Sequence, residues 1–302
     1  MRSEDQAAGA GDDPDVEPGG FVVLVEPGDR IHFLDWGGPG RPGIVLVHGL
    51  AGSAWAWTPV ARRLREARRT VAMDLRGHGL SDKPRDAYQD ARLWADDVHA
   101  VIQTLRLDHP VLCGWSYGPL VFLDYLRHYG ENAIGGLHWV GGVTKLGSED
   151  ALAVLTPEFL SIVPAFFSTD TETTVHGMDT LLRLCFSPEP SAPEKLLMLG
   201  YNLAVPPYVR QGMFSRVLNN DDLLAKITKP VLITQGDADA VVKPSIVDQH
   251  KAAMPHAQIH LMRNTAHAAF WTDAAAFNNR LHAFCDSLYT HPSPALAATL
   301  DA

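Results

Sequence analysis

A serine at position 116 stands in a pattern that is typical of nucleophilic catalysis. It lies at the centre of Gly114–Gly118 (GWSYG), directly after the apolar run 110–113 and before a segment with helical character. A Gly-x-Ser-x-Gly turn between a strand and a helix lifts the serine hydroxyl above a sharp corner, where only small flanking residues fit. The N-terminus of the following helix then faces the reacting oxygen. We therefore predict that Ser116 is a nucleophile.

A serine hydroxyl needs a base to remove its proton, so one of the fourteen histidines must reach Ser116. We favour His267, because it follows the apolar run 258–262 after a short loop, and such loops lie at the carboxyl edge of a sheet. We expect the histidines of strand-like runs to be packed and those of helix-like segments to be solvated. The first group is His32, His138 and His260, and the second is His128, His250 and His282.

The base in turn needs a carboxylate to fix its tautomer. The segment Gly236–Asp239 closes a strand-like run and offers two acids. We favour Asp239, which lies past the turn, and expect Asp237 to bond the local backbone. An acid after the run 136–143 is the other placement known on such sheets, but the first carboxylate there is Glu149.

A developing oxyanion needs backbone donors. We expect one from Tyr117, the residue after the nucleophile, and a second from Leu50 in the loop that follows the strand-like run 44–49. Gly49 lets this loop approach a ligand closely. We interpret His48 as a residue that braces the loop rather than as a second base.

The elements that must position these residues alternate along the chain. Strand-like and helix-like segments in alternation predict a mainly parallel sheet with helices on both faces. The first two strand-like runs flank Pro27-Gly28-Asp29 and predict an antiparallel hairpin. The strand-like runs are 21–25, 31–36, 44–49, 70–74, 110–116, 136–143, 230–237 and 258–262, and the helical segments are 57–67, 87–105, 116–129 and 274–288.

Residues 144–222 interrupt this alternation. They contain no clear strand but four helix candidates, at 149–167, 173–186, 193–203 and 207–218. An insertion of this length forms a structure of its own, and we interpret it as a helical cap over the carboxyl edge of the sheet, where open α/β sheets bind ligands. The sheet core then comprises residues 21–143 and 223–289.

The two ends differ from the core. Residues 1–20 carry six acids and one base, half of the formal charge of −10, and we expect a disordered leader; residues 290–302 are interpreted as a second tail. We find no secretory signal and no apolar run long enough to cross a bilayer, so we expect a cytoplasmic protein. Three cysteines cannot all pair, and Cys113 and Cys185 are expected to fill core space.

Together these features resemble the α/β-hydrolase superfamily in its cap-bearing branch. The resemblance is carried by His48-Gly49, Asp74–Ser81 (DLRGHGLS) and Gly114–Gly118, with Asp239 and His267 in the order Ser…Asp…His. That branch includes esterases, epoxide hydrolases and cofactor-free haloperoxidases. The resemblance covers 21–289 and implies an eight-stranded sheet with a lid, and neither a metal nor an organic cofactor. It assigns Asp74, Arg76 and Ser81 to bracing the site.

Departures from family patterns narrow the activity. Epoxide hydrolases carry aspartate where Ser116 stands. Haloperoxidase-like members favour proline and glycine where Ala51 and Pro119 stand, and hydrolases of carbon–carbon bonds favour Gly-Pro-Gly where residues 51–53 read AGS. We expect a serine hydrolase of a small hydrophobic carboxylic ester or lactone that forms an acyl-enzyme, with perhydrolysis and carbon–carbon cleavage as alternatives on the same triad.

A ligand receptor and a nucleic-acid-binding protein are two other classes of function. A ligand receptor can keep a hydrolase fold with little turnover, and the basic cluster Arg62, Arg63, Arg65, Arg68 and Arg69 could contact nucleic acid, although no recognition motif accompanies it. We expect neither nucleic acid nor a membrane as partner, and the oligomeric state stays open. The residues that could line an apolar pocket, or simply pack the cap helices, are Phe159, Phe166, Phe167, Met178, Leu181, Met198, Tyr201 and Met213.

Overall fold

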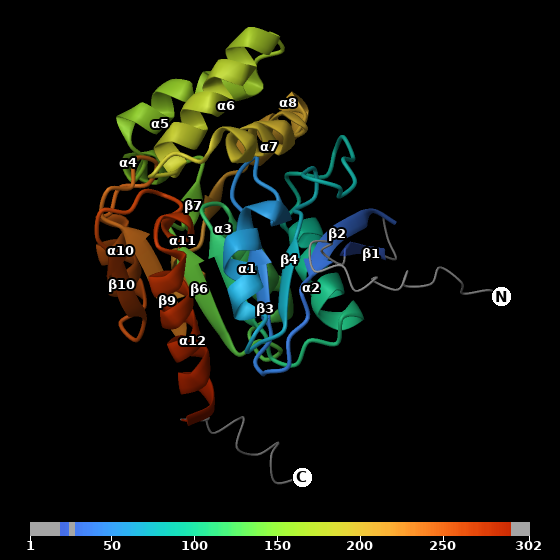
Figure 1. Cartoon of the computed structure of the whole chain (residues 1–302), viewed down its shortest axis with the longest axis vertical. Coiled ribbons are helices and arrows are strands. Elements are labelled where there is room, and N and C mark those ends of the chain that lie inside the picture. Colours follow the sequence, from blue (N-terminus) through green and yellow to red (C-terminus); the bar gives the residue numbers. More distant parts are fainter. Residues whose placement is uncertain (1–18, 24–27, 291–302) are drawn as a thin grey trace, which may run out of the picture.

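The computed structural model describes residues 19–23 and 28–290, which form one central sheet with helices around it (Figure 1). In this sheet the two strand pairs at the N-terminal edge are antiparallel and the other pairs are parallel. The strand order is β1 (Gly19–Val23), β2 (Arg30–Asp35), β4 (Thr70–Met73), β3 (Ile44–Val47), β5 (Val111–Trp115), β6 (Gly136–Val140), β9 (Val231–Gly236) and β10 (Gln258–Met262). This confirms the predicted eight-stranded, mostly parallel α/β fold.

Helices cover both faces of the sheet. On one face α2 (Ala91–Thr104) packs against α3 (Gly118–Tyr129), and on the other α1 (Thr58–Leu64) packs against α11 (Ala269–Thr272) and α12 (Ala274–Thr290) (Figure 1). The short η1 (Ala54–Trp57) precedes α1, and α10 (Ile246–Ala253) connects β9 to β10. Strands β3 to β6 and β9 are buried along their whole length, because a sheet covered on both faces has no solvated side.

The insertion between β6 and β9 is helical, and its helices gather at one end of the sheet (Figure 1). A two-residue ribbon of β7 (Lys145–Leu146) and β8 (Leu218–Asn219), not expected from the sequence, joins its two ends. Its helices are α4 (Glu149–Ala153), α5 (Pro157–Ile162), η2 (Val163–Phe167), α6 (Thr171–Cys185), α7 (Ala192–Leu203) and α8 (Pro207–Phe214), followed by α9 (Asp221–Leu224).

The prediction of a single helix at 149–167 is wrong, because the chain forms three short helices there. The Thr156 hydroxyl accepts a hydrogen bond from the Phe159 amide, and Pro157 occupies the first helical position. Both features start a new helix rather than continue one.

The described residues begin inside the segment expected to be a leader. Strand β1 begins at Gly19, so residues 19 and 20 belong to the sheet and not to a leader. Residues 1–18 of the expected leader and residues 291–302 of the expected tail lie outside the described residues. In the described part of the chain, no helix is long and apolar enough to cross a membrane.

Candidate active site

Ser116 sits at the corner between β5 and α3 in a backbone conformation that L-residues rarely adopt. Its φ is +58°, and its amide donates to the Val140 carbonyl oxygen over 2.9 Å. A Cβ atom on Gly114 would lie 2.8 Å from the carbonyl carbon of Gly118, and one on Gly118 would lie 3.0 Å from the Val47 oxygen. The strained corner therefore depends on both glycines, and it holds Ser116 at the end of the strand.

His267 and Asp239 are in contact, as the sequence predicts. Nδ1 of His267 lies 2.8 Å from Oδ2 of Asp239, and both side chains are fully buried. The other carboxylate oxygen, Oδ1, accepts hydrogen bonds from the amides of Val241 and Val242. Because a carboxylate accepts, the proton of the neutral imidazole lies on Nδ1. That leaves Nε2 as an acceptor, and it has no partner among the described residues.

The other acids considered from the sequence lie apart from His267. Oδ1 of Asp237 accepts from the amide of Asn264, 27 residues further along the chain, over 2.6 Å, and not from its own turn as the sequence predicts. Glu149 is exposed at the start of α4. At the end of β6 the residue next to the pair is Gly141, with φ +53°. A Cβ atom there would lie 2.9 Å from Nδ1 of His267, so this strand end has no room for a side chain.

The loop after β3 approaches Ser116 closely. A Cβ atom on Gly49 would lie 2.8 Å from the Cβ atom of Ser116. The amides of Leu50 and Tyr117 donate to no other described residue. Both amides are therefore available as donors, and their role in an oxyanion hole stays a prediction.

Three buried side chains hold this loop. His48 and Asp74 do so as the sequence analysis expects, whereas His78 had no predicted role. Nε2 of His48 accepts from the Leu75 amide over 3.0 Å, and Nε2 of His78 accepts from the Ala51 amide over 3.2 Å. Oδ1 of Asp74 accepts from the Ser53 hydroxyl and the Ala54 amide. Burial lowers the pKa of both imidazoles, that of His78 to about 3, so both are neutral acceptors at pH 7.

Asp74 is buried and ionised. Burial opposes ionisation, but hydrogen bonds from His32 and from the amides of Ala54 and Leu80 hold the pKa of Asp74 well below its usual range. The Ser81 hydroxyl donates to the Asp74 carbonyl oxygen over 2.7 Å. The second expected brace, Arg76, makes a bidentate pair with Asp97, with both distances 2.7 Å. These contacts fix the second loop of the site.

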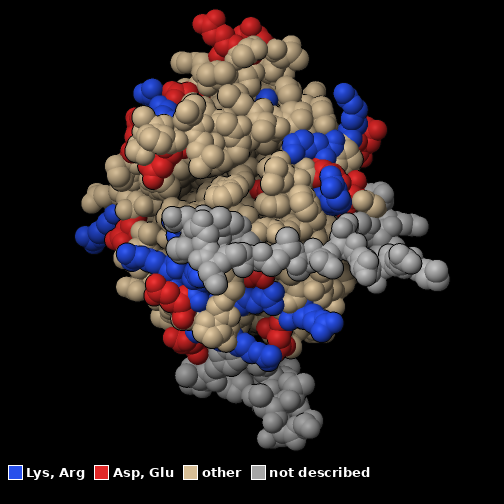
Figure 2. All heavy atoms as spheres, turned by 45° about the vertical axis from the view of Figure 1, so that its right-hand side comes forward, with Lys and Arg blue, Asp and Glu red and all other residues tan. Residues whose placement is uncertain are grey.

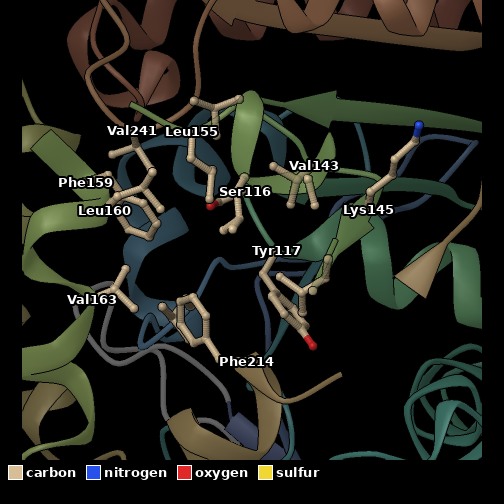
Figure 3. Close-up of a pocket in the computed structure, with 16 residues that line it drawn as sticks. Ser116, Tyr117, Val143, Lys145, Leu155, Phe159, Leu160, Val163, Phe214 and Val241 are labelled. Atoms are coloured by element: carbon tan, nitrogen blue, oxygen red, sulfur yellow. The ribbon is translucent and has the colours of Figure 1, made fainter. Parts of the chain in front are cut away.

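Two cavities meet at Ser116. The larger measures about 130 Å³, and its walls are almost entirely apolar, with Leu155, Phe159 and Phe214 among them. Figure 3 shows the Ser116 hydroxyl directed into this space, whereas the Lys145 amine and the Tyr117 hydroxyl point away from it. Lys145 pairs with Asp221 over 2.7 Å. Apart from the Ser116 hydroxyl, the labelled side chains that point into the larger cavity are therefore apolar.

The smaller cavity measures about 40 Å³ and is the one that His267 lines. Ser116, Trp115 and Asn202 also belong to its walls. The indole nitrogen of Trp115 donates to the His267 carbonyl oxygen over 3.1 Å and so holds the histidine loop. Ser116 and His267 therefore line the same cavity.

The residues of the insertion that the sequence analysis names as possible pocket-lining residues divide into two groups. Phe159, Leu181 and Tyr201 line the cavities. The remaining five do not line either cavity and pack among the helices instead: Phe166, Phe167, Met178, Met198 and Met213. Ordinary packing thus accounts for more than half of the set.

One histidine expectation is wrong. His250 on α10 is not solvated but 2% exposed, with its ring 5.3 Å from that of Trp139. Burial lowers the pKa of His250 to about 4, and neither ring nitrogen has a partner among the described residues. The expected packing of the strand histidines holds for His32 and His138. The cysteines, including Cys113 and Cys185, are free and buried.

Two contacts of the site have no sequence motif. Nε2 of Gln235 donates to Oδ2 of Asp239 over 2.8 Å, the oxygen that also contacts His267. Asn202, from the insertion, donates from Nδ2 to the carbonyl oxygen of Ala51 in the loop after β3. The contact of Gln235 with Asp239 could have been found from the sequence, because the two residues are four positions apart. Ala51 and Asn202 lie 151 positions apart, so the sequence gives no signal of their contact.

The basic cluster near α1 does not form a uniform positive surface. Arg68 is buried and bonded to Asp286, and Arg69 pairs with Asp35 over 2.7 Å. On the face that Figure 2 presents, basic and acidic side chains are interspersed. Among the described residues, no group of three or more His, Cys, Asp or Glu side chains could hold a metal ion.

Comparisons with known proteins agree with this architecture. The family model of the alpha/beta hydrolase fold matches residues 42–274. The crystal structure of the esterase RhEst1 from Rhodococcus sp. ECU1013 has 32% identity and a TM-score of 0.82, covering 89% of this chain and 98% of its own. The AB hydrolase superfamily protein YisY of Bacillus subtilis is 26% identical over 287 residues, 84% of this chain and 95% of that protein. A pimeloyl-[acyl-carrier protein] methyl ester esterase of Vibrio atlanticus is 26% identical over 260 residues, covering 80% and 94%. The chain therefore belongs to the alpha/beta hydrolase fold family, a family of hydrolases with esterases among the relatives of this protein.

Proposed function

We propose that this protein is a serine esterase that cleaves small hydrophobic carboxylic esters or lactones through an acyl-enzyme. The observation that carries the proposal is the arrangement of His267. Its Nδ1 is bound to buried Asp239, its Nε2 has no partner among the described residues, and His267 lines the cavity that Ser116 also lines. This is the tautomer that a general base for the serine hydroxyl requires.

In the proposed reaction, Oγ of Ser116 attacks the substrate carbonyl carbon and its proton passes to Nε2 of His267. The amides of Leu50 and Tyr117 stabilise the oxyanion that forms. The carbon–oxygen bond to the alcohol then breaks, and the alcohol takes the proton from Nε2. Water next attacks the acyl carbon and gives a proton to the same nitrogen. The bond from the acyl carbon to Oγ of Ser116 then breaks, Oγ takes the proton back from Nε2, and the acid is released.

The substrate preference follows from the larger cavity. An engineered apolar cavity of about 150 Å³ takes up benzene, so a cavity of about 130 Å³ with apolar walls suits a short aliphatic or phenyl group. The esterase relative at 32% identity supports ester chemistry. We propose that residues 144–222 act as the cap, because Leu155, Phe159 and Phe214 from this segment wall the cavity.

The test is a panel of p-nitrophenyl esters of increasing acyl length together with lactones of different ring size, with Ser116→Ala as the blank. We expect the highest kcat/KM for a short acyl chain and no hydrolysis above the blank in the variant. Equal rates for the two proteins would overturn the assignment of Ser116. Binding of the esters without turnover by the folded wild type would favour a receptor.

A further inference from the structure

The side chain of Asn202 on α7 is buried next to the proposed catalytic groups, and its amide oxygen makes no hydrogen bond to a described residue. It is 3% exposed, and Nδ2 donates to the carbonyl oxygen of Ala51 over 2.5 Å. A carbonyl oxygen only accepts, so this contact fixes which end of the amide faces the loop. Oδ1 therefore points the other way, and it has no partner among the described residues.

The backbone around Asn202 is held in place by a buried arginine. Nε of Arg210 donates to the carbonyl oxygen of Phe166 over 2.7 Å, and Nη1 donates to that of Asn202 over 3.3 Å. These bonds join α8, η2 and α7. Asn202 is thus a fixed acceptor, and an unsatisfied buried acceptor in a native protein calls for a ligand group or a water.

The smaller cavity is where such a group would lie. Asn202 lines it together with Ser116 and His267, and most of its other walls are apolar, among them Leu181 and Phe186. A cavity needs about 10–15 Å³ to hold one water-sized group, so about 40 Å³ admits roughly three such groups in a row. The two carbons and the terminal hydroxyl of a 2-hydroxyethyl group have this size.

The direction of the reaction decides which part of an ester enters each cavity. A general acid must reach the leaving oxygen, and His267 lines the smaller cavity but not the larger. The alcohol therefore leaves through the smaller cavity, and the acyl chain occupies the larger, apolar one. Asn202 is then on the alcohol side of the ester.

We propose that Asn202 is a specificity-determining residue whose Oδ1 accepts a hydrogen bond from a hydroxyl group on the leaving alcohol. The preferred substrates are then short hydroxyalkyl esters of apolar acids. This inference rests on the proposed esterase function. It adds a substrate class that an apolar pocket alone does not select, because a buried acceptor discriminates strongly against an analogue that lacks the donor.

The experiment compares 2-hydroxyethyl butyrate with n-propyl butyrate, which have equal numbers of heavy atoms and differ by a hydroxyl in place of a methyl group. The kcat/KM of each is measured by acid release for the wild type and for Asn202→Leu. Loss of the Ala51 contact in the variant slows both esters alike, so it cancels in the ratio of the two values. We expect that ratio to fall at least tenfold in Asn202→Leu and to be unchanged in Gly200→Ala, a control on the same helix.

A wild-type measurement makes the test independent of how well the variant folds. The ratio for the wild-type protein is divided by the ratio for hydroxide-catalysed hydrolysis of the same esters, and we expect a quotient above ten. A quotient near one, or an unchanged ratio in Asn202→Leu, overturns the inference about Asn202. If both esters are still hydrolysed in a Ser116-dependent way, the esterase proposal stands. Hydrolysis of neither ester above the Ser116→Ala blank, with no activity on the p-nitrophenyl panel, overturns both.

Discussion

Oδ2 of Asp239 contacts two side chains at once, Nδ1 of His267 and Nε2 of Gln235, each over 2.8 Å. Together with the two backbone amides on Oδ1, these contacts leave the carboxylate little freedom to rotate. The orientation of the imidazole is therefore set from β9 and the turn after it, before any substrate binds. Such fixed positioning is what a general base needs in order to act without reorganisation.

Replacing His267 by Gln removes the proposed base while keeping a polar side chain. We expect kcat on p-nitrophenyl butyrate to fall by about 10³–10⁴, with KM changed much less, because the base acts only in the transition state. Asp239→Asn should give a fall of similar order. His128→Gln, at an exposed position on α3, is the control for loss of an imidazole. A fall of less than tenfold in His267→Gln would contradict the assigned role.

Two glycine-to-alanine variants distinguish an effect on the proposed oxyanion loop from an effect on the stability of the protein. In Gly49→Ala the new methyl group would lie 2.8 Å from the Cβ atom of Ser116, so the loop must shift. We expect a loss of about 10² in kcat, the effect of displacing one oxyanion donor. In Gly200→Ala the new methyl group meets nothing within 4 Å, and the helix should gain about 0.5–1 kcal/mol. Steady-state kinetics and urea denaturation of both variants give the comparison. Equal kcat values in the two variants would contradict this view of the loop.

A buried ion pair fastens the insertion to the core. Arg216 lies beyond α8, and its Nη2 is 2.6 Å from Oδ2 of Asp124 on α3, while its Nη1 donates to the Tyr117 hydroxyl. Both charged side chains are almost fully buried. Arg216→Met should lower the free energy of unfolding by about 3–5 kcal/mol, because the Asp124 carboxylate loses its partner. Arg216→Met combined with Asp124→Leu should recover part of this loss. The prediction is contradicted if urea denaturation places the single variant within 1 kcal/mol of the wild type.

His250 makes stability depend on acid pH. Its folded pKa of about 4 lies below the ordinary value of 6.5, so the unfolded chain takes up the proton first. The stability from the neutral ring is complete above pH 6.5 and is lost as the pH falls toward 4. Between pH 7.5 and 5 the loss from this group is about 2 kcal/mol. His250→Phe should lose correspondingly less stability over this range in urea denaturation, with His128→Phe as the control. The same loss in His250→Phe as in the wild type would show that this ring does not contribute.

The sequence was sufficient for most of the fold and for the contact between Asp239 and His267. Strand ends of a parallel sheet meet at one edge, so residues that follow the runs 230–237 and 258–262 converge whatever the intervening chain does. The break before Pro157 also has a local signal, because Thr156 and Pro157 together favour the start of a new helix. The burial of His250 has one too, since its spacing from Ile246, Val247 and Met254 follows one face of a helix.

Contacts made by the insertion could not be predicted in this way. The bond from Asn202 to Ala51 and the pair of Arg216 with Asp124 join residues about 90 to 150 positions apart. They depend on how the helices of residues 144–222 lie over the sheet edge. Periodicity identifies the buried face of each helix but not its direction, so the walls of the cavities required the structure.

The most direct test of the central claim is the intact mass of the protein after exposure to a fluorophosphonate, which reacts with serines activated by an imidazole base. We predict one adduct per chain on the wild type, mapped to Ser116 by peptide analysis, and none on Ser116→Ala under the same conditions. His267→Gln should label far more slowly than the wild type. Absence of labelling of the folded wild type, or equal labelling of Ser116→Ala, would contradict the account.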